Sequence, residues 1–404
     1  MKSILGLLMM ALFPLQSLAI QPTSLEPAHE VVAYYASWNL YAARPYLLTD
    51  IPGDRLTQVV YSFALISEDG ECISGDEWAD LQAPYPNQDD SAAVKGHFGQ
   101  IPALRERFPD LKIILAIGGW TGSSRFSDVA LTPESRTKFV ESCVAFMRRY
   151  DFDGLDIDWE YPVAEGAPGN SRRPEDKANL TFLLSDFRAA LTARGEADGR
   201  AYTLTLAAPT SPSLWSNFEW AEIAPLLDHV FLMAYDMAGA WSNVTGPHAP
   251  LFADPANPAQ PAINGDAAVQ AYIGMGVPAE KLILGVPFYG KAWSGAAATG
   301  DGLYQPFSGL PNGDGSFTYR QIAAEFLGTA GVTVGWNDAG QFPWLYRADD
   351  GLVISYDDAR SLRLKAAYAR EQGLGGVGLW EISQDDEART LLDALWAGLQ
   401  AGGS

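Results

Sequence analysis

Short apolar runs alternate with amphipathic segments along most of the chain. Eight runs rich in β-branched residues predict strands at 31–35, 58–63, 112–117, 154–158, 203–207, 229–234, 282–286 and 376–380. Apolar positions at helical spacing predict helices at 133–150, 174–194, 266–275, 357–372 and 387–399. Strands this continuously apolar suit a parallel sheet that is covered on its outside. The pattern therefore predicts an α/β fold, a (β/α)8 TIM barrel in which helices surround eight parallel strands.

The interval between the last two strands is too long for a single helix. About 70 residues, rich in Gly, Tyr and Phe, separate residue 286 from residue 357. This composition predicts a small α+β insertion after the seventh strand, at the barrel rim where the active sites of this fold lie. We therefore expect barrel residues at 20–287 and 356–404, with the insertion domain at 288–355 between them.

Residues 1–19 predict a secretory signal peptide. Lys2 precedes an apolar run at 4–18, and Ser17 and Ala19 place small side chains before the expected cleavage point. The run is too short for a comfortable membrane span, and no other segment is apolar enough for one. We expect a mature chain that begins near Ile20 and lies outside the cytoplasm, secreted or periplasmic, without membrane attachment.

The charge of the chain limits its partners. The 404 residues carry 27 Lys and Arg against 49 Asp and Glu, a formal net charge of −22. An acidic surface repels nucleic acid and anionic lipid, whereas a neutral polysaccharide is indifferent to it. The composition, 48% hydrophobic and 19% charged, is that of an ordinary globular protein. We expect no nucleic-acid partner, no cofactor and a monomer.

The chain has two cysteines, Cys72 and Cys143, too few for a disulfide framework. Cys143 lies in the predicted helix 133–150 among Val140, Val144 and Phe146, so we expect a buried free thiol there. Cys72 lies in a polar segment that predicts a loop. A bond between the two cysteines is the alternative.

A row of acidic residues ends the fourth predicted strand. Alternate side chains of a strand share one face, so Asp156, Asp158 and Glu160 point one way, and Leu155 and Ile157 point the other. Buried carboxylates are costly, and close neighbours raise one another's pKa. One member of such a row can stay protonated near neutral pH and donate a proton. Glu160 comes last, at the mouth of the barrel, and is the candidate acid.

Three other interpretations of this row are open. A solvated acidic turn is disfavoured by the interleaved Leu155, Ile157 and Trp159. A site for a divalent cation is the second, because carboxylates bind hard cations, but none of the four histidines is near in sequence. The third is a structural polar network without catalysis. We expect no metal here.

The residues around this row resemble a known family. Asp153-x-x-Asp156-x-Asp158-x-Glu160, followed by Tyr-Pro, resembles the signature of the family 18 glycoside hydrolases, the chitinases. Further blocks resemble the family in the same order, at 34–38, 61–63, 116–120, 233–236, 286–293 and 376–382. The resemblance covers roughly residues 30–395. It departs at Ala116, where the family usually has Ser, and at Asn337, where relatives have Asp.

The resemblance implies a retaining mechanism in which the N-acetyl group of the substrate is the nucleophile. Glu160 would protonate the leaving oxygen and later activate water. Asp158 would orient the acetamido group, and Asp156 would share a proton with Asp158. Tyr235 would donate its hydroxyl to the acetamido oxygen, and Asp236 would hold the sugar and tune Glu160. The residues support this independently, because a developing cation needs preorganised negative charge.

The resemblance also implies a sugar-binding cleft with Trp380 as the floor under the sugar that is cut. Sugar rings stack their C–H faces on aromatic side chains, so a chain with 12 Trp can line a glycan track. Core packing is the alternative for each further candidate, and Trp159 should face the packing. The further substrate-binding candidates are Asp236, Met233, Trp120, Tyr34, Phe63, Tyr289, Trp241, Trp38, Arg320, Tyr319 and Gly119.

The hypothesis that follows is a secreted chitinase that cuts β-1,4 bonds between N-acetylglucosamine units. A sugar-binding relative without activity is disfavoured, because such proteins typically lack the acid and Glu160 is present. An endo-β-N-acetylglucosaminidase acting on N-linked glycans shares the carboxylate motif, but the insertion and the Trp set favour a longer chain. A metal-dependent hydrolase is the remaining alternative, and loss of activity in a chelator would favour it.

Overall fold

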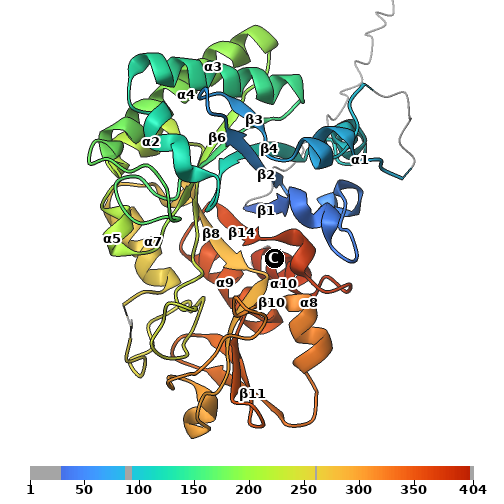
Figure 1. Cartoon of the computed structure of the whole chain (residues 1–404), viewed down its shortest axis with the longest axis vertical. Helices are drawn as coiled ribbons and strands as arrows, with labels where there is room; N and C mark the ends of the chain where they lie inside the picture. The colour runs from blue at the N-terminus through green and yellow to red at the C-terminus, as the bar shows by residue number, and fades with distance from the viewer. Residues whose placement is uncertain (1–28, 87–92, 260–261, 401–404) are drawn as a thin grey trace, which may run out of the picture.

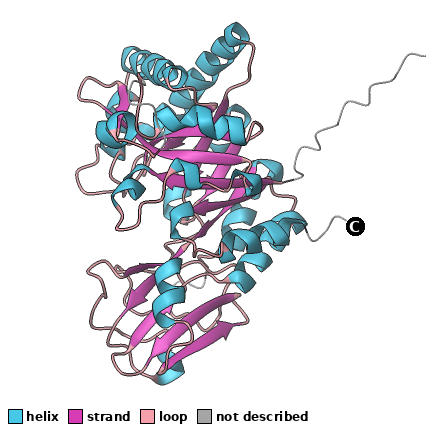
Figure 2. Ribbon diagram, turned by 90° about the vertical axis from the view of Figure 1, so that its right-hand side faces the viewer, coloured by secondary structure: helices cyan, strands magenta, loops and turns pink. Residues whose placement is uncertain are grey.

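A computed structural model describes residues 29–86, 93–259 and 262–400 of the chain (Figure 1). The predicted signal peptide at 1–19 lies outside the described residues. Figure 2 shows a helix-covered barrel in the upper part of the view and a separate sheet in the lower part.

Eight parallel strands close into the predicted barrel, and each predicted strand overlaps one of them. The strands are β1 (Glu30–Ala36), β2 (Gln58–Ile66), β4 (Lys112–Gly118), β5 (Gly154–Asp158), β6 (Thr203–Ala208), β7 (His229–Leu232), β8 (Leu282–Pro287) and β14 (Gly376–Trp380). β1 pairs in parallel with both β2 and β14, which closes the sheet. The fold is therefore a TIM barrel, as the alternation predicts.

Helices cover the outside of the barrel. They are α1 (Ile101–Arg107), α2 (Phe126–Val129), α3 (Pro133–Arg149), α4 (Asp176–Asp198), α5 (Pro212–Trp215), α6 (Trp220–Ile223), α7 (Gly265–Gly274), α9 (Ala359–Glu371) and α10 (Thr390–Gln400). The Asp358 side chain accepts hydrogen bonds from the backbone N–H groups of Arg360 and Ser361, so α9 begins two residues after the predicted start. In the described part of the chain, no helix is long and apolar enough to cross a bilayer.

The strands bury two separate apolar clusters because their side chains alternate. Outward-facing residues such as Leu155 and Ile157 join the large cluster between barrel and helices. A smaller cluster fills the barrel itself, and Phe63, Met233, Tyr235 and Trp380 pack against it (its buried members are Val32, Tyr34, Val60, Ile114, Ala116, Phe231 and Ile283). The apolar cluster inside the barrel is therefore bordered by three partly buried aromatic rings and one methionine side chain.

A second sheet of five antiparallel strands lies between β8 and α9, as the long interval predicts. Its strand order is β10 (Ser316–Thr318), β9 (Tyr289–Trp293), β13 (Leu352–Ser355), β12 (Phe342–Arg347) and β11 (Val332–Asn337), and the short α8 (Tyr319–Gln321) follows β10. The segment after β7 packs on this sheet, because the Trp293 indole N–H donates to the Gly239 carbonyl at 3.1 Å. The pattern of the sequence did not reveal this attachment.

The two cysteines form a disulfide bond, so the expected free thiol at Cys143 is wrong. The segment around Cys72 is not a loop but a short strand, β3 (Cys72–Ser74), that pairs antiparallel with β2. The backbone N–H of Cys72 donates to Ser142 Oγ in α3 at 3.0 Å, and the Cα atoms of the two cysteines are 4.9 Å apart. The disulfide bond thus depends on strand β3, which the polar sequence of this segment did not predict.

Candidate active site

Asp156 is the innermost member of the acidic row of β5. It is fully buried inside the barrel, accepting a hydrogen bond from the Tyr34 hydroxyl at 2.9 Å and one from Thr205 Oγ1 at 2.6 Å. Burial raises the pKa of Asp156 to about 6, although both hydrogen bonds lower it. Protein donors occupy both carboxyl oxygens of Asp156. Asp156 therefore acts on the neighbouring side chains and does not bind a ligand directly.

Asp158, the next member of the row, is buried with one oxygen that lacks a partner. Its Oδ1 has no hydrogen bond from the protein, which is costly for a buried carboxyl group. Burial, followed by the charges of Glu160 and Asp156, raises its pKa well above the usual value. Its backbone carbonyl is held by the Gly119 N–H at 2.9 Å and by Ser123 Oγ at 3.0 Å. The backbone of Asp158 is therefore held in place, and its carboxyl group can still accept a ligand N–H.

Glu160 follows β5 and remains partly exposed. Its backbone N–H donates to Ser123 Oγ at 2.9 Å and its carbonyl accepts from Asn170 Nδ2 at 2.9 Å, next to a cis peptide bond with Tyr161. Burial and the charge of Asp236 raise the pKa of Glu160 to about 7, against a hydrogen bond from Tyr161 that lowers it. A carboxyl group with this pKa can donate a proton near neutral pH.

Asp236 follows β7 and has the opposite character. Its Oδ1 accepts from the Tyr289 hydroxyl at 2.7 Å and lies 3.3 Å from the Lys291 ammonium nitrogen and 3.4 Å from His248 Nδ1. Burial raises the pKa of Asp236, but the groups around the carboxylate outweigh burial and hold the pKa below the usual value. Two neighbouring carboxyl groups whose pKa values are pushed apart are typical of an acid that lies beside a carboxylate that stays ionised.

Tyr235 stands beside these carboxyl groups. Its ring packs against Phe231 and Tyr289, with centroids 6.4 and 6.2 Å away. Burial and the charges of Asp158 and Asp236 raise the pKa of Tyr235 well above 10. The hydroxyl therefore keeps its proton and can donate a hydrogen bond to a bound group.

Three aromatic rings form a platform beside the acidic row. The Phe63 ring is stacked on Trp380 with centroids 5.9 Å apart and planes 20° apart, and the Trp38 ring lies 6.2 Å from each. Tyr34, which holds Asp156, lies 5.6 Å from Trp380 by centroid. Gly119 borders the platform, because a Cβ atom there would lie 2.7 Å from the Phe63 ring. These candidates lie on β1, β2 and β14 or in the segments that follow β1 and β4, and they meet at one end of the barrel.

The remaining candidates are placed differently. Trp120 and Trp241 are 51% and 62% exposed, and the Lys291 ammonium lies 5.8 Å from the Trp241 ring centroid. Arg320 donates to the carbonyls of Ser383 and Asp385, so it holds the segment after β14. Tyr319 is buried in the large outer cluster. The structure therefore does not bring Tyr319 and Arg320 into contact with the carboxyl groups.

Residues 30–385 match the family described as glycosyl hydrolases family 18. The chain belongs to this family. Chitinase A1 of Niallia circulans is 39% identical over 444 aligned residues, which cover 100% of this chain and 63% of that protein. The chain thus spans less than two thirds of the length of this relative.

Solved family 18 structures share the architecture. A chitinase from Bacillus thuringiensis superposes with a TM-score of 0.88 at 35% identity, over 93% of this chain and 70% of that one. A family 18 N-acetylglucosaminidase from Paenibacillus barengoltzii gives 0.78 at 33% identity, over 92% and 99% of the two chains. The chain is therefore a family 18 glycoside hydrolase with a TIM barrel.

Several residues of this family 18 site were not among the sequence candidates. Ser123, Asn170 and Tyr161 hold Glu160, and Lys291 and His248 face Asp236. Lys291 lies inside the block at 286–293 that resembles the family. The sequence therefore marked Lys291 as a residue of interest but did not indicate its contact with Asp236. Trp159, as predicted, faces the packing, with its ring stacked 5.3 Å from Phe126.

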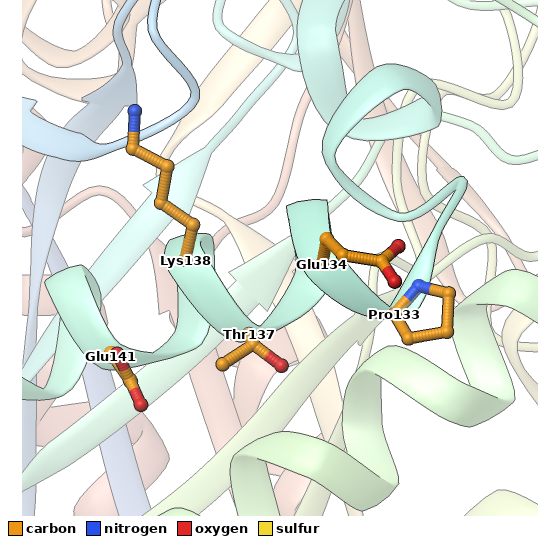
Figure 3. Close-up of a pocket in the computed structure, with 5 residues that line it drawn as sticks. All are labelled: Pro133, Glu134, Thr137, Lys138 and Glu141. Atoms are coloured by element: carbon orange, nitrogen blue, oxygen red, sulfur yellow. The ribbon is translucent and has the colours of Figure 1, made fainter.

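The site is distinct from the surface hollow of about 420 Å³ on α3 (Figure 3). That hollow is shallow, and none of its lining residues belongs to the acidic row (they are Pro133, Glu134, Thr137, Lys138 and Glu141). Within the described residues, no group of three or more His, Cys, Asp or Glu is arranged to hold a metal ion. The carboxyl groups at the end of β5 are thus the candidate centre of the chemistry.

Proposed function

We propose that this family 18 hydrolase is a chitinase that cuts β-1,4 bonds between N-acetylglucosamine units. The observation that carries the proposal is the acidic row in which Asp156 and Asp158 are buried and the partly exposed Glu160 has a pKa raised to about 7. The curated relative named chitinase A1 supports the same substrate. The formal net charge of −22 is compatible with a neutral polysaccharide.

In the first step the carbonyl oxygen of the substrate's own acetamido group attacks the anomeric carbon. The glycosidic C–O bond breaks as Glu160 transfers its proton to the leaving oxygen, and a cyclic oxazolinium ion forms. In the second step water attacks the anomeric carbon and Glu160 takes up a proton from this water. The ring C–O bond of the oxazolinium ion breaks, which restores the acetamido group with retained configuration.

Asp158, Asp156 and Tyr235 arrange the acetamido group for this attack. The unpaired Oδ1 of Asp158 accepts the acetamido N–H, which turns the carbonyl oxygen toward the anomeric carbon. Asp156 keeps its place between Tyr34 and Thr205. In the proposed mechanism it shares a proton with Asp158. The Tyr235 hydroxyl donates to the acetamido oxygen. Holding the reacting groups in one geometry removes much of the entropic barrier.

The platform of Trp38, Phe63 and Trp380 binds the sugar rings. Apolar C–H faces stack on aromatic surfaces, and Trp380 adjoins Tyr34 and thus the acidic row. The partly exposed Trp38 extends the same surface toward solvent. In this proposal a sugar ring on Trp380 lies beside the acidic row, and Trp38 continues the stacking surface toward solvent.

Replacing the acid tests the proposal. Glu160→Gln removes the proton donor with little change of shape, so turnover of chitin oligomers should fall by at least about a hundredfold. Oligomer binding, measured by isothermal titration calorimetry, should be nearly unchanged. Glu141→Gln, on the exposed face of α3, is the matched control and should behave like the unaltered protein. Undiminished turnover in Glu160→Gln would reject the assignment.

Substrates without the acetyl group test whether the acetamido oxygen is the nucleophile. Oligomers that lack the acetyl group on the sugar at the cleavage point should not be cut, because no carbonyl oxygen can attack. Their cleavage at the rate of fully acetylated oligomers would show that the acetamido group is not the nucleophile.

A second candidate is the release of single N-acetylglucosamine units. The solved family 18 N-acetylglucosaminidase from Paenibacillus barengoltzii, which superposes over 92% of this chain, favours it. A product time course by mass spectrometry separates the two activities. Disaccharides and larger products at early times indicate a chitinase, whereas monosaccharide alone indicates the second candidate.

We also propose that the protein is exported through residues 1–19, which have the charge and apolar pattern of a signal peptide. N-terminal sequencing of protein expressed with this segment tests the proposal. A mature N-terminus near Ile20 outside the cytoplasm supports export, and an uncut chain retained in the cytoplasm contradicts it.

A further inference from the structure

His248 is fully buried where the barrel and the second sheet meet. Its backbone N–H donates to Ser355 Oγ in β13 at 3.0 Å, and its carbonyl accepts from the Met237 N–H at 2.9 Å. Its ring lies 4.9 Å from the Tyr289 ring by centroid. His248 thus connects the segment after β7 to both β9 and β13.

The two ring nitrogens of His248 face different kinds of partner. Nε2 lies 3.2 Å from the Tyr289 carbonyl oxygen, which can only accept, so Nε2 carries a hydrogen. Nδ1 lies 3.2 Å from the backbone nitrogen of Asp236, whose N–H points at it. A peptide N–H can only donate, so Nδ1 must offer its lone pair. This set of partners is satisfied by the neutral imidazole with its hydrogen on Nε2.

The carboxylate of Asp236 does not require a proton on Nδ1. The distance from Nδ1 to Asp236 Oδ1 is 3.4 Å, longer than the contact with the backbone nitrogen. The same oxygen already accepts from the Tyr289 hydroxyl and lies 3.3 Å from the Lys291 ammonium nitrogen. Lys291 and Tyr289 therefore remain as partners of the Asp236 carboxylate when His248 is neutral.

The backbone of Asp236 needs such a partner. Its φ of +56° lies in the left-handed region, which is unfavourable for a residue with a Cβ atom and persists where its surroundings hold it. The hydrogen bond to His248 Nδ1 acts on the N–H of this same residue. The conformation in turn sets the direction in which the Asp236 carboxylate projects.

We propose that His248 is a positioning residue whose neutral imidazole accepts the Asp236 N–H and thereby directs the Asp236 carboxylate toward Lys291, Tyr289 and Glu160. Because His248 is also bound to Tyr289 and Ser355, the placement of Asp236 depends on the docking of the second sheet. The proposal rests on the proposed hydrolase function, in which Asp236 keeps Glu160 protonated.

Two substitutions separate the ring nitrogens. His248→Asn keeps an acceptor at the position of Nδ1 and loses the bond to the Tyr289 carbonyl. His248→Gln keeps a donor near the position of Nε2 and loses the acceptor for the Asp236 N–H. Ser355→Ala is the control, because it removes a contact of the His248 backbone and leaves both ring nitrogens in place.

The proposal predicts different kinetics for these variants with chitin oligomers. His248→Gln should lower kcat about tenfold, the effect of losing one buried hydrogen bond, with little change in KM. The alkaline limb of its pH profile should move to lower pH, because the displaced Asp236 charge no longer supports the proton on Glu160. His248→Asn and Ser355→Ala should keep the limb of the unaltered protein. Equal losses in the Asn and Gln variants, or an unmoved limb in His248→Gln, would overturn the proposal.

A measurement on the unaltered protein decides the tautomer without any assay of activity. Nitrogen NMR of protein labelled at histidine distinguishes protonated from unprotonated ring nitrogens, and His248→Asn identifies the resonances among the four histidines. A hydrogen on Nε2 and none on Nδ1 at neutral pH supports the proposal, whereas a hydrogen on Nδ1 rejects it. If the unaltered protein shows no turnover, the hydrolase proposal fails, but the NMR measurement still decides the tautomer of His248.

Discussion

At the scale of residues, Glu160 and Asp236 are neighbouring carboxyl groups whose pKa values move in opposite directions. Burial and the charge of Asp236 raise the pKa of Glu160 to about 7. Contacts with His248, Lys291 and Tyr289 lower the pKa of Asp236 despite its burial. The difference between the two groups comes from their partners and not from their chemical type.

This difference gives a prediction for pH dependence. Glu160 must be protonated to donate, so kcat/KM should be high below its pKa and fall as the pH rises through about 7. Asp236→Asn removes the neighbouring charge and should move this fall to lower pH. Asp110→Asn, an exposed carboxylate on the surface, should leave the profile in place. A profile that does not move in Asp236→Asn would contradict the coupling.

Gly119 gives a second prediction at this scale. Its φ is +78°, and a Cβ atom would lie 2.7 Å from the Phe63 ring, so Gly119→Ala should displace Phe63 from Trp380. We expect KM for chitin oligomers to rise several-fold. Gly199 has a similar φ of +69° with nothing within 4 Å, so Gly199→Ala controls for backbone strain alone. Equal effects of the two variants would show that contact with Phe63 is unimportant.

At the scale of elements, strand β3 is attached to the barrel by two kinds of bond. It pairs antiparallel with β2, and its Cys72 is bonded to Cys143 of α3. A cross-link over 71 residues restricts the unfolded chain strongly. The bond therefore stabilises the attachment of the β2–β3 hairpin to its covering helix.

Removing the disulfide should cost stability but not chemistry. Replacing both cysteines by serine should lower the free energy of unfolding by about 2–4 kcal/mol. Denaturant titration measures this loss. The kcat of the folded protein should stay the same, because neither cysteine contacts the carboxyl groups of the site. A loss of kcat at temperatures where the variant is fully folded would show that the hairpin also shapes the active site.

At the scale of the whole molecule, the barrel and the second sheet build the site together. The barrel supplies the acidic row of β5, while β9 of the second sheet supplies Tyr289 and Lys291 to Asp236. Trp241, in the segment that packs between them, is 62% exposed beside Lys291. An exposed aromatic ring therefore lies beside the residues that the second sheet contributes to the site.

The contribution of Trp241 should depend on the length of the chitin oligomer. Trp241→Ala should lower kcat/KM for long chitin oligomers several-fold and change that for short ones little, because we expect its exposed ring to stack on a sugar beyond the one that is cut. Phe182→Ala on α4 removes another exposed ring and is the matched control. An equal loss with all oligomers would place Trp241 at the cleavage point instead of along the track.

The sequence alone determined the eight strands, the second sheet and the common face of Asp156, Asp158 and Glu160. These features follow from periodicity and composition, which are local properties of the chain. The tertiary structure decided the disulfide, the burial of Tyr319 and the partnership of His248 with Asp236. Each of these joins segments far apart, as with Cys72 and Cys143, which are 71 residues apart. Such contacts depend on how the barrel closes and how the second sheet docks, and no local pattern encodes them.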